Sequence, residues 1–482
     1  MTRRTTLLTL LFLCVSLLRM LPGLSSFFDP QDFYTFLNPL ARGDSFSEYM
    51  LDGWSWHDGE TGVRIGFFRP LTSLTYIPEH FAWGSSPLPY RLTSLLFHAA
   101  ACLVVFALCR GFKGNGIAAG LLAAAAPGTV YAVWLINGRG DVMAPLFGLA
   151  AVAAAIGLTG RERNGLFRSL LPGLLCLLAM ASKEQGMASV PACVLAWILV
   201  PGGSRSRKTT VRFAAGLLCA SALYLGARLI MFRGVGGYGN LVPWSVMPRH
   251  LLVLVFQFTG AGLIPWRIAR WAYLLLLALP VTLYGASSRR NLRITLFLLL
   301  LIPLFGFQSI VGDTCSHYIF APAVVFALLL GVSLGFFSRV IVTVVTVLLL
   351  SLWVVLGLGE SARLDSITAP FEKAHAASRE VLPHLIEGGA EEPVLVYLDP
   401  ESRGDPLLSE TKNIPVYLDH LSGGLAPFRT GALAVEATTG EWSVVIWVKR
   451  HWEPGEEGIS QGTVLIWDGD SIEVISSSDF RI

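Results

Sequence analysis

Long hydrophobic segments separated by short polar links dominate the first 358 residues of the chain. A transmembrane helix needs about 20 mostly apolar residues, so this pattern predicts a polytopic α-helical membrane protein. The segments expected to span the membrane are Thr6–Leu24, Leu92–Leu108, Ile117–Ile136, Val142–Leu158, Leu166–Ala181, Met187–Val200, Phe213–Phe232, Trp271–Tyr284, Leu296–Val311, Tyr318–Phe337 and Val340–Leu358. We expect the first to be an uncleaved helix with a cytoplasmic N-terminus, the alternative being a cleaved signal peptide.

One further apolar run, Leu251–Ile264, leaves the number of spans open. It has only 14 residues, which favours a re-entrant or interfacial piece over a span. The arginine-rich link 287–293 should be cytoplasmic, because basic links gather on that side. Eleven spans and an extracytoplasmic tail satisfy this rule. If the run does cross, there are twelve spans and the tail is cytoplasmic.

Residues 26–90 interrupt the hydrophobic pattern. This long loop is rich in acidic residues, tryptophan and proline, and we expect it to contain interfacial helices on the extracytoplasmic side. The alternation of basic links places two short turns on the same face, 137–141 and 182–185. Residues 1–358 would thus form one membrane domain with a large external loop.

The tail, residues 359–482, has a different character. Helical spacing covers Pro370–Ile386, and strand-like runs follow at Val394–Leu398, Ile414–Leu418, Trp442–Val448, Gly462–Trp467 and Ile472–Ile475. The Asp468-Gly469-Asp470 sequence is typical of a hairpin turn. We expect a small α/β domain on the extracytoplasmic side, without a recognisable catalytic or phosphate-binding motif.

Composition supports this division and excludes several classes of protein. The 482 residues are 53% hydrophobic and only 14% charged, which excludes a soluble globular enzyme and a disordered chain. The net charge of +3 conceals a basic body and an acidic tail. The basic excess lies between the hydrophobic runs and does not indicate nucleic-acid binding. The 7 cysteines form no CxxC pair, so neither a disulfide framework nor a zinc site is expected.

Charged residues retained at membrane depth are functional candidates. Outside the first loop the body has four acids, Asp141, Glu162, Glu184 and Asp313. All except Glu162 fall on the extracytoplasmic face, and so do the cations Arg69, Arg139, Lys183 and His317. Such a cluster suits a charged ligand, since arginine and lysine bind phosphate well. The structural alternatives are an Asp141–Arg139 pair across a tight turn, and Lys183 with Glu184 capping a helix.

Two acids directly after the first span are candidates for a general base. Asp29 and Asp32 lie in the segment Phe27–Tyr34, close to the membrane surface. A carboxylate there could take the proton from an acceptor hydroxyl. Alternatively, either residue could simply cap an interfacial helix, and Asp29 before Pro30 fits that role.

The membrane body of the chain, with these residues, resembles the GT-C glycosyltransferases, which are membrane enzymes that use polyprenyl-phosphate sugars. Within this group it most resembles the membrane part of protein O-mannosyltransferases with tetratricopeptide repeats, and their bacterial relatives. The resemblance covers residues 1–340 and excludes the tail, which has no such repeats. It rests on the order of six patches: Phe28 to Asn38, Phe68 to Tyr76, Tyr90 to His98, Pro127 to Asp141, Ser182 to Glu184, and His317 to Pro322.

The resemblance implies an inverting transfer of a hexose or pentose from a polyprenyl-phosphate donor to a protein, lipid or glycan acceptor. It implies Asp32 as the base, with Asp29 as its competitor. It further implies that Lys183, Arg139 and His317 bind the donor phosphate, beside Tyr318. Arg69 and Glu184 would then order the site. Asp141 would orient Arg139. No metal ligand is predicted, although a divalent cation is compatible with the family.

This chain departs from the family pattern at three positions. Gln31-Asp32 stands where two adjacent acids are usual, His317 replaces an arginine, and Ala126 replaces a histidine. A contact from His317 to phosphate would depend on pH. These departures keep open a second hypothesis, a catalytically inactive GT-C scaffold whose acidic tail binds a partner. The expected location is the bacterial inner membrane, with the site facing the periplasm.

Overall fold

The structure is a computed structural model of the chain. It describes residues 3–29, 32–41, 46, 49, 55–57, 64–158, 165–201, 206–232, 243–311, 316–387, 394–398, 431–438, 441–448, 463–467 and 472–476. The predicted strand Ile414–Leu418 and the acids Glu162 and Asp313 lie outside the described residues.

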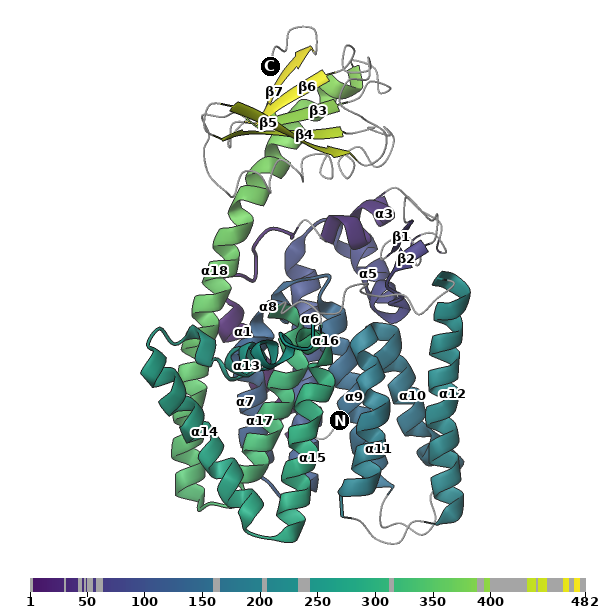
Figure 1. Cartoon of the computed structure of the whole chain (residues 1–482), viewed down its shortest axis with the longest axis vertical. Coiled ribbons are helices and arrows are strands. Elements are labelled where there is room, and N and C mark those ends of the chain that lie inside the picture. Colours follow the sequence, from purple (N-terminus) through teal and green to yellow (C-terminus); the bar gives the residue numbers. More distant parts are fainter. Residues whose placement is uncertain are drawn as a thin grey trace.

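Helices make up the body of the molecule (Figure 1). Its longer helices are α1 (Arg3–Met20), α5 (Pro70–Trp83), α6 (Pro87–Gly111), α7 (Gly116–Ala125), α9 (Arg139–Gly157), α10 (Leu166–Ser182), α11 (Ser189–Leu199), α12 (Arg207–Phe232), α13 (Met247–Thr259), α14 (Arg267–Ala286), α15 (Arg289–Phe305), α17 (Phe320–Leu334) and α18 (Arg339–Glu387). Short helical pieces connect them: η1 (Phe33–Leu37), α3 (Asn38–Ala41), η2 (Pro127–Thr129), α8 (Val130–Trp134), η3 (Glu184–Ala188), η4 (Ala261–Leu263), α16 (Phe307–Val311) and η5 (Ser316–Ile319).

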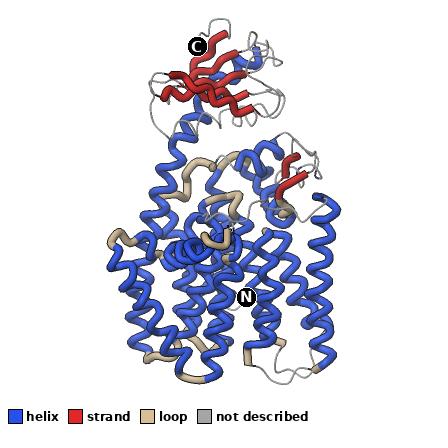
Figure 2. The backbone as a smooth tube through the Cα atoms, in the orientation of Figure 1, coloured by secondary structure: helices blue, strands red, loops and turns tan. Residues whose placement is uncertain are grey.

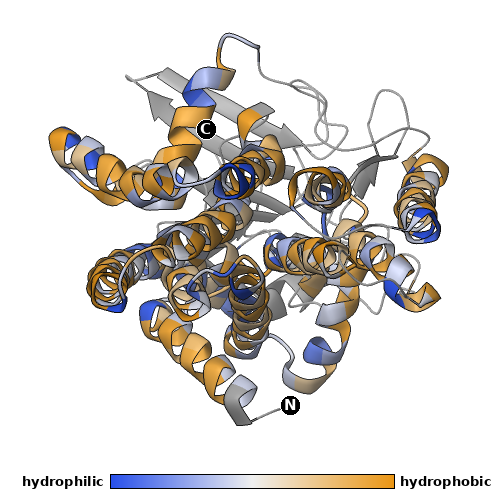
Figure 3. Cartoon of the chain, turned by 90° about the horizontal axis from the view of Figure 1, so that it is seen from below, coloured by the Kyte–Doolittle hydropathy of each residue, from blue (hydrophilic) through white to orange (hydrophobic). Residues whose placement is uncertain are grey.

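The body has the hydrophobicity of a multi-pass membrane protein. Within the described residues, 5 helices are long and apolar enough to cross a membrane, or 6 if the bent pair α7–α8 counts as one span. Further apolar helices of 10–17 residues, among them α10 and α17, pack beside these. Figure 3 shows that the helices carry mostly hydrophobic residues, also on their outer surfaces. Large side chains such as Leu218, Ile230 and Leu275 are exposed there, as expected of a surface that faces lipid.

The predicted span Ile117–Ile136 is broken in the structure. The pieces on either side of residue 126 are bent by 58°. Pro127 causes the break, because it lacks an N–H and disfavours a helical conformation at the residue before it. The guanidinium of Arg19 donates to the carbonyl of Ala126 and to Thr129 Oγ1, so α1 is bonded to the polar groups at the break.

The apolar run Leu251–Ile264, whose sequence leaves its crossing of the membrane open, falls largely within α13, a helix of 13 residues. At 1.5 Å per residue it is about 20 Å long, too short to cross a bilayer alone. It ends at Gly260, whose left-handed φ of 78° is suited to glycine. The structure thus agrees with a non-crossing segment, and the total of eleven spans stays a prediction.

The loop after α1 contains one longer helix, and its expected place in the membrane interface stays a prediction. Helix α5 begins at Pro70 and exposes Phe81 and Trp83, while the strands β1 (Ser55–His57) and β2 (Arg64–Gly66) pair antiparallel before it. Aromatic side chains exposed along one helix are typical of a membrane–water boundary.

The tail contains a five-stranded sheet above the long helix α18 (Figure 2). Its strands are β3 (Val394–Leu398), β4 (Gly431–Thr438), β5 (Glu441–Val448), β6 (Thr463–Trp467) and β7 (Ile472–Ser476), in the order β5-β4-β3-β6-β7. β3 is parallel to both its neighbours, and β6 and β7 form the antiparallel hairpin expected around residues 468–470. That this sheet forms an independent α/β domain stays a prediction.

Candidate active site

The segment that follows α1 is held against the body by one arginine. Arg91, near the start of α6, is fully buried and donates to the carbonyls of Ser26, Phe27 and Trp134. These bonds satisfy loop carbonyls that would otherwise be buried without partners. They fix the direction in which the chain approaches Asp29 and Asp32.

Asp32 is the most completely enclosed carboxylate of the first loop among the described residues, with 0% of its surface exposed. Its Oδ1 accepts the backbone N–H of Asn137 at 2.8 Å, and its Oδ2 accepts that of Asp29 at 3.1 Å. The second bond resembles one half of a capping box, so part of the structural alternative is realised. Within the part of the chain that is described, no ion pair to Asp32 is recorded.

This environment makes Asp32 a stronger base than an ordinary aspartate. Burial, followed by the charge of Asp29, raises the pKa of Asp32 to about 8, against the lowering effect of the Asn137 N–H and of Arg91. A general base is most effective when its pKa lies near the working pH. The raised pKa of Asp32 therefore suits proton abstraction.

Arg139, at the start of α9, is surrounded by protein groups. Its guanidinium donates to Glu79 Oε2 at 2.7 Å, to Thr75 Oγ1 at 2.8 Å and to the carbonyl of Tyr90 at 2.9 Å, and Nε donates to Ser94. Its carbon Cζ lies 4.5 Å from the centre of the Tyr76 ring.

Every nitrogen of Arg139 thus has a protein partner, and the side chain is 0% exposed. Arg139 joins α5, α6 and α9 in one buried network. Its contact with a donor phosphate stays a prediction.

Lys183 follows α10 and pairs with Asp141, in the first turn of α9. Lys183 Nζ lies 2.5 Å from Asp141 Oδ2 and 4.6 Å from the centre of the Tyr318 ring. Both charged side chains are at most 2% exposed. Burial lowers the pKa of Lys183 to about 8, although the charge of Asp141 acts in the opposite direction. The second oxygen of Asp141, Oδ1, has no hydrogen-bond partner among the described residues.

Glu184 lies between two arginines. Arg69, just before α5, donates to Glu184 Oε2 through Nη2 at 2.9 Å and Nε at 3.1 Å. Arg228 of α12 lies 3.5 Å from Oε1. Burial alone would raise the pKa of Glu184, but Arg69 and Arg228 outweigh it and lower the pKa below its usual value. Glu184 is therefore a fixed anion that ties three elements together.

The contacts bear on the two structural alternatives. Asp141 binds Lys183 and not Arg139, because α9 begins at Arg139 and successive residues on a helix point to different sides. Lys183 directly follows α10 and Glu184 is the first residue of η3, so both lie at a helix end, as the capping alternative expects. Arg69 pairs with Glu184, and their ordering of the site stays a prediction.

The site residues meet around the turn before α9. Asn137 contacts Asp32, Arg139 reaches α5, and Asp141 reaches Lys183. The hydroxyl of Thr72 donates to the carbonyl of Ser182 at 2.7 Å and holds α5 to the end of α10. Gln31 and the side chain of His317 lie outside the described residues.

Several residues of these networks were missed by the sequence analysis. Glu79, Arg91 and Arg228 lie inside helices that were predicted only as apolar or interfacial. Charged residues within such helices are rare, so their charge alone could have marked them as functional candidates. The N–H of Asn137 gives no signal in a sequence, because any residue except proline can supply a backbone donor.

Among the described residues, no group of three or more His, Cys, Asp or Glu side chains is placed to hold a metal ion. The carboxylates described above are instead bound by backbone N–H groups, a lysine and arginines.

The overall fold matches two solved membrane proteins. ArnT from Cupriavidus metallidurans in the apo state aligns with a TM-score of 0.54 and 12% sequence identity, over 89% of this chain and 92% of that chain. Its undecaprenyl phosphate-bound form aligns with a TM-score of 0.51. The arabinofuranosyltransferase AftD from Mycobacteria aligns with a TM-score of 0.51 and 14% identity, over 82% of this chain and 29% of AftD. The chain is thus a multi-pass membrane protein with the GT-C glycosyltransferase fold.

Sequence similarity points to one group within this class. The chain is 26% identical over 204 residues to the human protein O-mannosyl-transferase TMTC3, covering 42% of this chain and 20% of the relative. It is 30% identical over 224 residues to Drosophila melanogaster Tmtc1, covering 44% of this chain and 25% of the relative. The chain thus spans a quarter or less of these relatives' length, and no family model matches it. The predicted resemblance to GT-C glycosyltransferases of the O-mannosyltransferase type is confirmed.

Proposed function

We propose that this protein is an integral-membrane glycosyltransferase that moves a sugar from a polyprenyl-phosphate donor to an extracytoplasmic acceptor with inversion. The observation that carries the proposal is Asp32, a buried carboxylate with a raised pKa that is bound by two backbone N–H groups, one of them in the turn before α9. The sequence similarity to protein O-mannosyl-transferases supports the same reaction class.

Asp32 takes the proton from the acceptor hydroxyl as the hydroxyl oxygen attacks the anomeric carbon. The bond between that carbon and the phosphate oxygen breaks, and the electron pair leaves with the polyprenyl phosphate. A single direct displacement inverts the anomeric centre, whereas retention needs a covalent intermediate. One base suffices for this step, so the single carboxylate of Asp32 is adequate.

Lys183 is the cation that we assign to the leaving phosphate. An ammonium group offers three donors, of which one is directed at Asp141. Because Lys183 is only 2% exposed and its Nζ faces the Tyr318 ring, the phosphate reaches it only if Tyr318 moves aside. A fixed positive charge at the leaving oxygen stabilises the transition state without reorganisation.

The bilayer itself takes part in this proposal. The polyprenyl chain of the donor is apolar and would lie against the exposed hydrophobic helices (Figure 3). A bacterial inner-membrane location with the first loop facing the periplasm is part of the proposal. The TM-score of 0.51 with undecaprenyl phosphate-bound ArnT supports a lipid-phosphate ligand for the same fold.

The test is turnover with purified full-length protein in lipid nanodiscs. Polyprenyl-phosphate hexoses and pentoses are offered with a mixture of peptide, lipid and glycan acceptors, and released polyprenyl phosphate is measured. Release from one donor, with an inverted linkage in the product, is the expected result. Absence of release from every donor and acceptor pair would overturn the proposal and leave a non-catalytic scaffold.

A further inference from the structure

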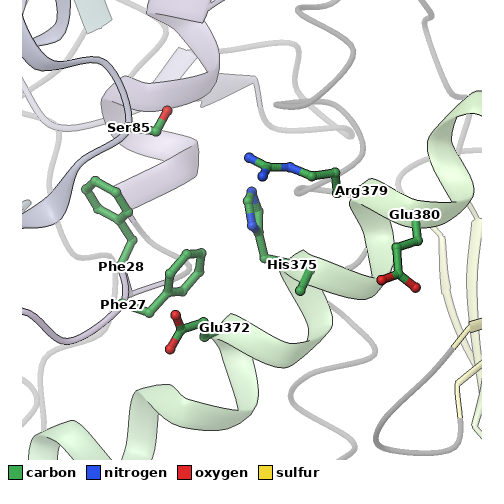
Figure 4. Close-up of a pocket in the computed structure, with 8 residues that line it drawn as sticks. Phe27, Phe28, Ser85, Glu372, His375, Arg379 and Glu380 are labelled. Atoms are coloured by element: carbon green, nitrogen blue, oxygen red, sulfur yellow. The ribbon is translucent and has the colours of Figure 1, made fainter.

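A cavity of about 470 Å³ lies between the beginning of the first loop and the upper part of α18 (Figure 4). Phe27, Phe28 and Ser85 form one wall, and α18 supplies Glu372, His375 and Arg379 on the other. Small-molecule sites have volumes of about 300–1,000 Å³. The cavity is therefore large enough for a small ligand, and it is not part of the residue networks described above.

Hydrogen bonds below the cavity hold its two walls in place. The Gly23 N–H donates to Ser361 Oγ at 2.9 Å, and that hydroxyl donates to the carbonyl of Met20 at 3.1 Å. Ser26 Oγ donates to Asp365 at 2.6 Å. Beyond these contacts Arg91 binds the carbonyl of Ser26 in the loop, while α18 continues toward the sheet of the tail (Figure 1). The cavity opens where the two segments separate.

The helix side of the cavity is polar where a packed helix would be apolar. Positions spaced by three and four residues lie on one face of a helix. Ser361, Leu364 and Thr368 are buried along such a face of α18. The same spacing then continues through Glu372, His375 and Arg379, which line the cavity. This face of α18 is thus buried against the body below the cavity and carries charged side chains at the cavity. Charged side chains lining a cavity are suited to a polar ligand.

The cavity lining is connected through the chain to the candidate base. The Phe28 ring lies edge-on to Phe36 and Tyr90, with centroids 6.4 and 5.9 Å away. The next residue, Asp29, donates its backbone N–H to Asp32. A lining residue of the cavity is thus the direct neighbour of a residue that is hydrogen-bonded to Asp32.

We propose that this cavity binds the acceptor of the glycosyl transfer, and that the part of the acceptor held there is a neutral, hydroxyl-rich saccharide unit. The inference rests on the proposed function, since it assigns the second substrate of the same reaction.

The chemistry of the lining selects this class of ligand. Glu372 accepts hydrogen bonds from hydroxyl groups, and Arg379 donates to hydroxyl oxygens. The Phe27 and Phe28 rings offer apolar surface for the C–H face of a sugar. An ionic ligand would meet a like charge whichever sign it carried, because both signs line the cavity. Figure 4 shows Arg379 extending from α18 toward Ser85, and Glu372 toward Phe27, so both charged groups border the same space.

The test begins with binding in the absence of donor. Saturation-transfer NMR is recorded on the full chain in nanodiscs with a panel of free mono- and disaccharides and with serine- and threonine-containing peptides. We expect saccharide signals, and we expect Arg379→Ala and Glu372→Gln each to weaken binding about tenfold, because each removes a hydrogen bond to a charged group. Lys373→Ala is the matched control, since it removes a cation from the same helix outside the cavity lining.

Kinetics give the second readout. With a saccharide acceptor, the same two variants should raise the KM for acceptor about tenfold while leaving kcat and the KM for donor unchanged. Saccharide binding that Arg379→Ala and Glu372→Gln do not weaken would overturn the inference, and so would peptide binding in place of saccharide binding. Cavity-dependent saccharide binding without turnover from any donor would overturn the proposed function alone and leave the saccharide site standing.

Discussion

Two buried carboxylates near the same turn have opposite properties. Asp32 is bound by two neutral backbone N–H groups, and its pKa is raised to about 8, chiefly by burial. Glu184 is also enclosed, but Arg69 and Arg228 hold its pKa below the usual value against the effect of burial.

The contrast explains how one site can contain both a carboxylate that acts as a base and a carboxylate that stays ionised in an ion pair. Neutral donors orient a carboxylate without removing its affinity for a proton, whereas a full positive charge stabilises the ionised form. Glu184 is paired with Arg69 and Arg228 and ties three elements together. Asp32 is left with a proton affinity useful in catalysis.

The strongest test of the contrast is Asp32→Asn. The amide keeps the size of the side chain but cannot accept a proton, so kcat should fall by about 10²–10⁴-fold, the usual contribution of a general base. Release of polyprenyl phosphate with the best donor and acceptor measures it. Asp29→Asn is the control and should retain most of the activity. The reverse outcome, loss in Asp29→Asn and retention in Asp32→Asn, would move the base to Asp29.

A second test concerns the Lys183–Asp141 pair. Lys183→Met leaves the buried Asp141 charge without its partner, and we expect a loss of stability of about 3–5 kcal/mol. The double variant Lys183→Met/Asp141→Leu removes both charges and should recover most of that loss. Thermal unfolding in detergent reports the difference between them. Turnover should stay low in both, because the cation assigned to the leaving phosphate is gone; normal turnover in the double variant would contradict that assignment.

The sequence predicted the helical membrane body well, because an apolar run of about 20 residues has the length and the hydrophobicity that a bilayer requires of a spanning helix. It also predicts that Asp32, Arg69, Lys183 and Glu184 lie on one face of the membrane, since alternating basic links fix the side on which each turn lies. The break before Pro127 was missed, although proline was the signal, because hydropathy stays high across it.

Partner choice within the site could not be predicted from the sequence. Whether Asp141 meets Arg139 or Lys183 depends on where α9 begins and on how α10 ends, to within one residue. Element boundaries are the least reliable part of a sequence-based prediction. The cavity beside α18 could not be predicted either, because its two walls come from the start of the first loop and from the tail, which lie far apart in the sequence.

A smaller effect is expected at the arginines that hold Glu184. Arg69→Lys preserves the charge but loses the two-nitrogen contact to Oε2, because lysine offers a compact ammonium in place of a planar fork. We expect a loss of about 1.5–3 kcal/mol in stability, the range for hydrogen bonds to charged groups, and little change in the acid limb of the pH profile. Arg363→Lys, at an exposed pair with Glu360, is the control and should be near neutral. Equal effects at the two sites would show that Glu184 is not a structural centre.

The pH dependence of kcat/KM for the acceptor distinguishes the proposed base, Asp32, from the proposed phosphate-binding cation, Lys183. Asp32 must be ionised, so below its pKa of about 8 the rate should rise about tenfold per pH unit. Lys183 must be protonated, and because burial lowers its pKa to about 8, the rate should fall again at higher pH. The profile should therefore be a narrow bell centred near pH 8, with apparent pKa values that belong to the pair of groups.

Lys183→Arg should abolish the alkaline limb alone, since arginine stays charged. An alkaline limb that persists in this variant would show that another group titrates there, and the assignment of Lys183 to the leaving phosphate would then fail while that of Asp32 stands.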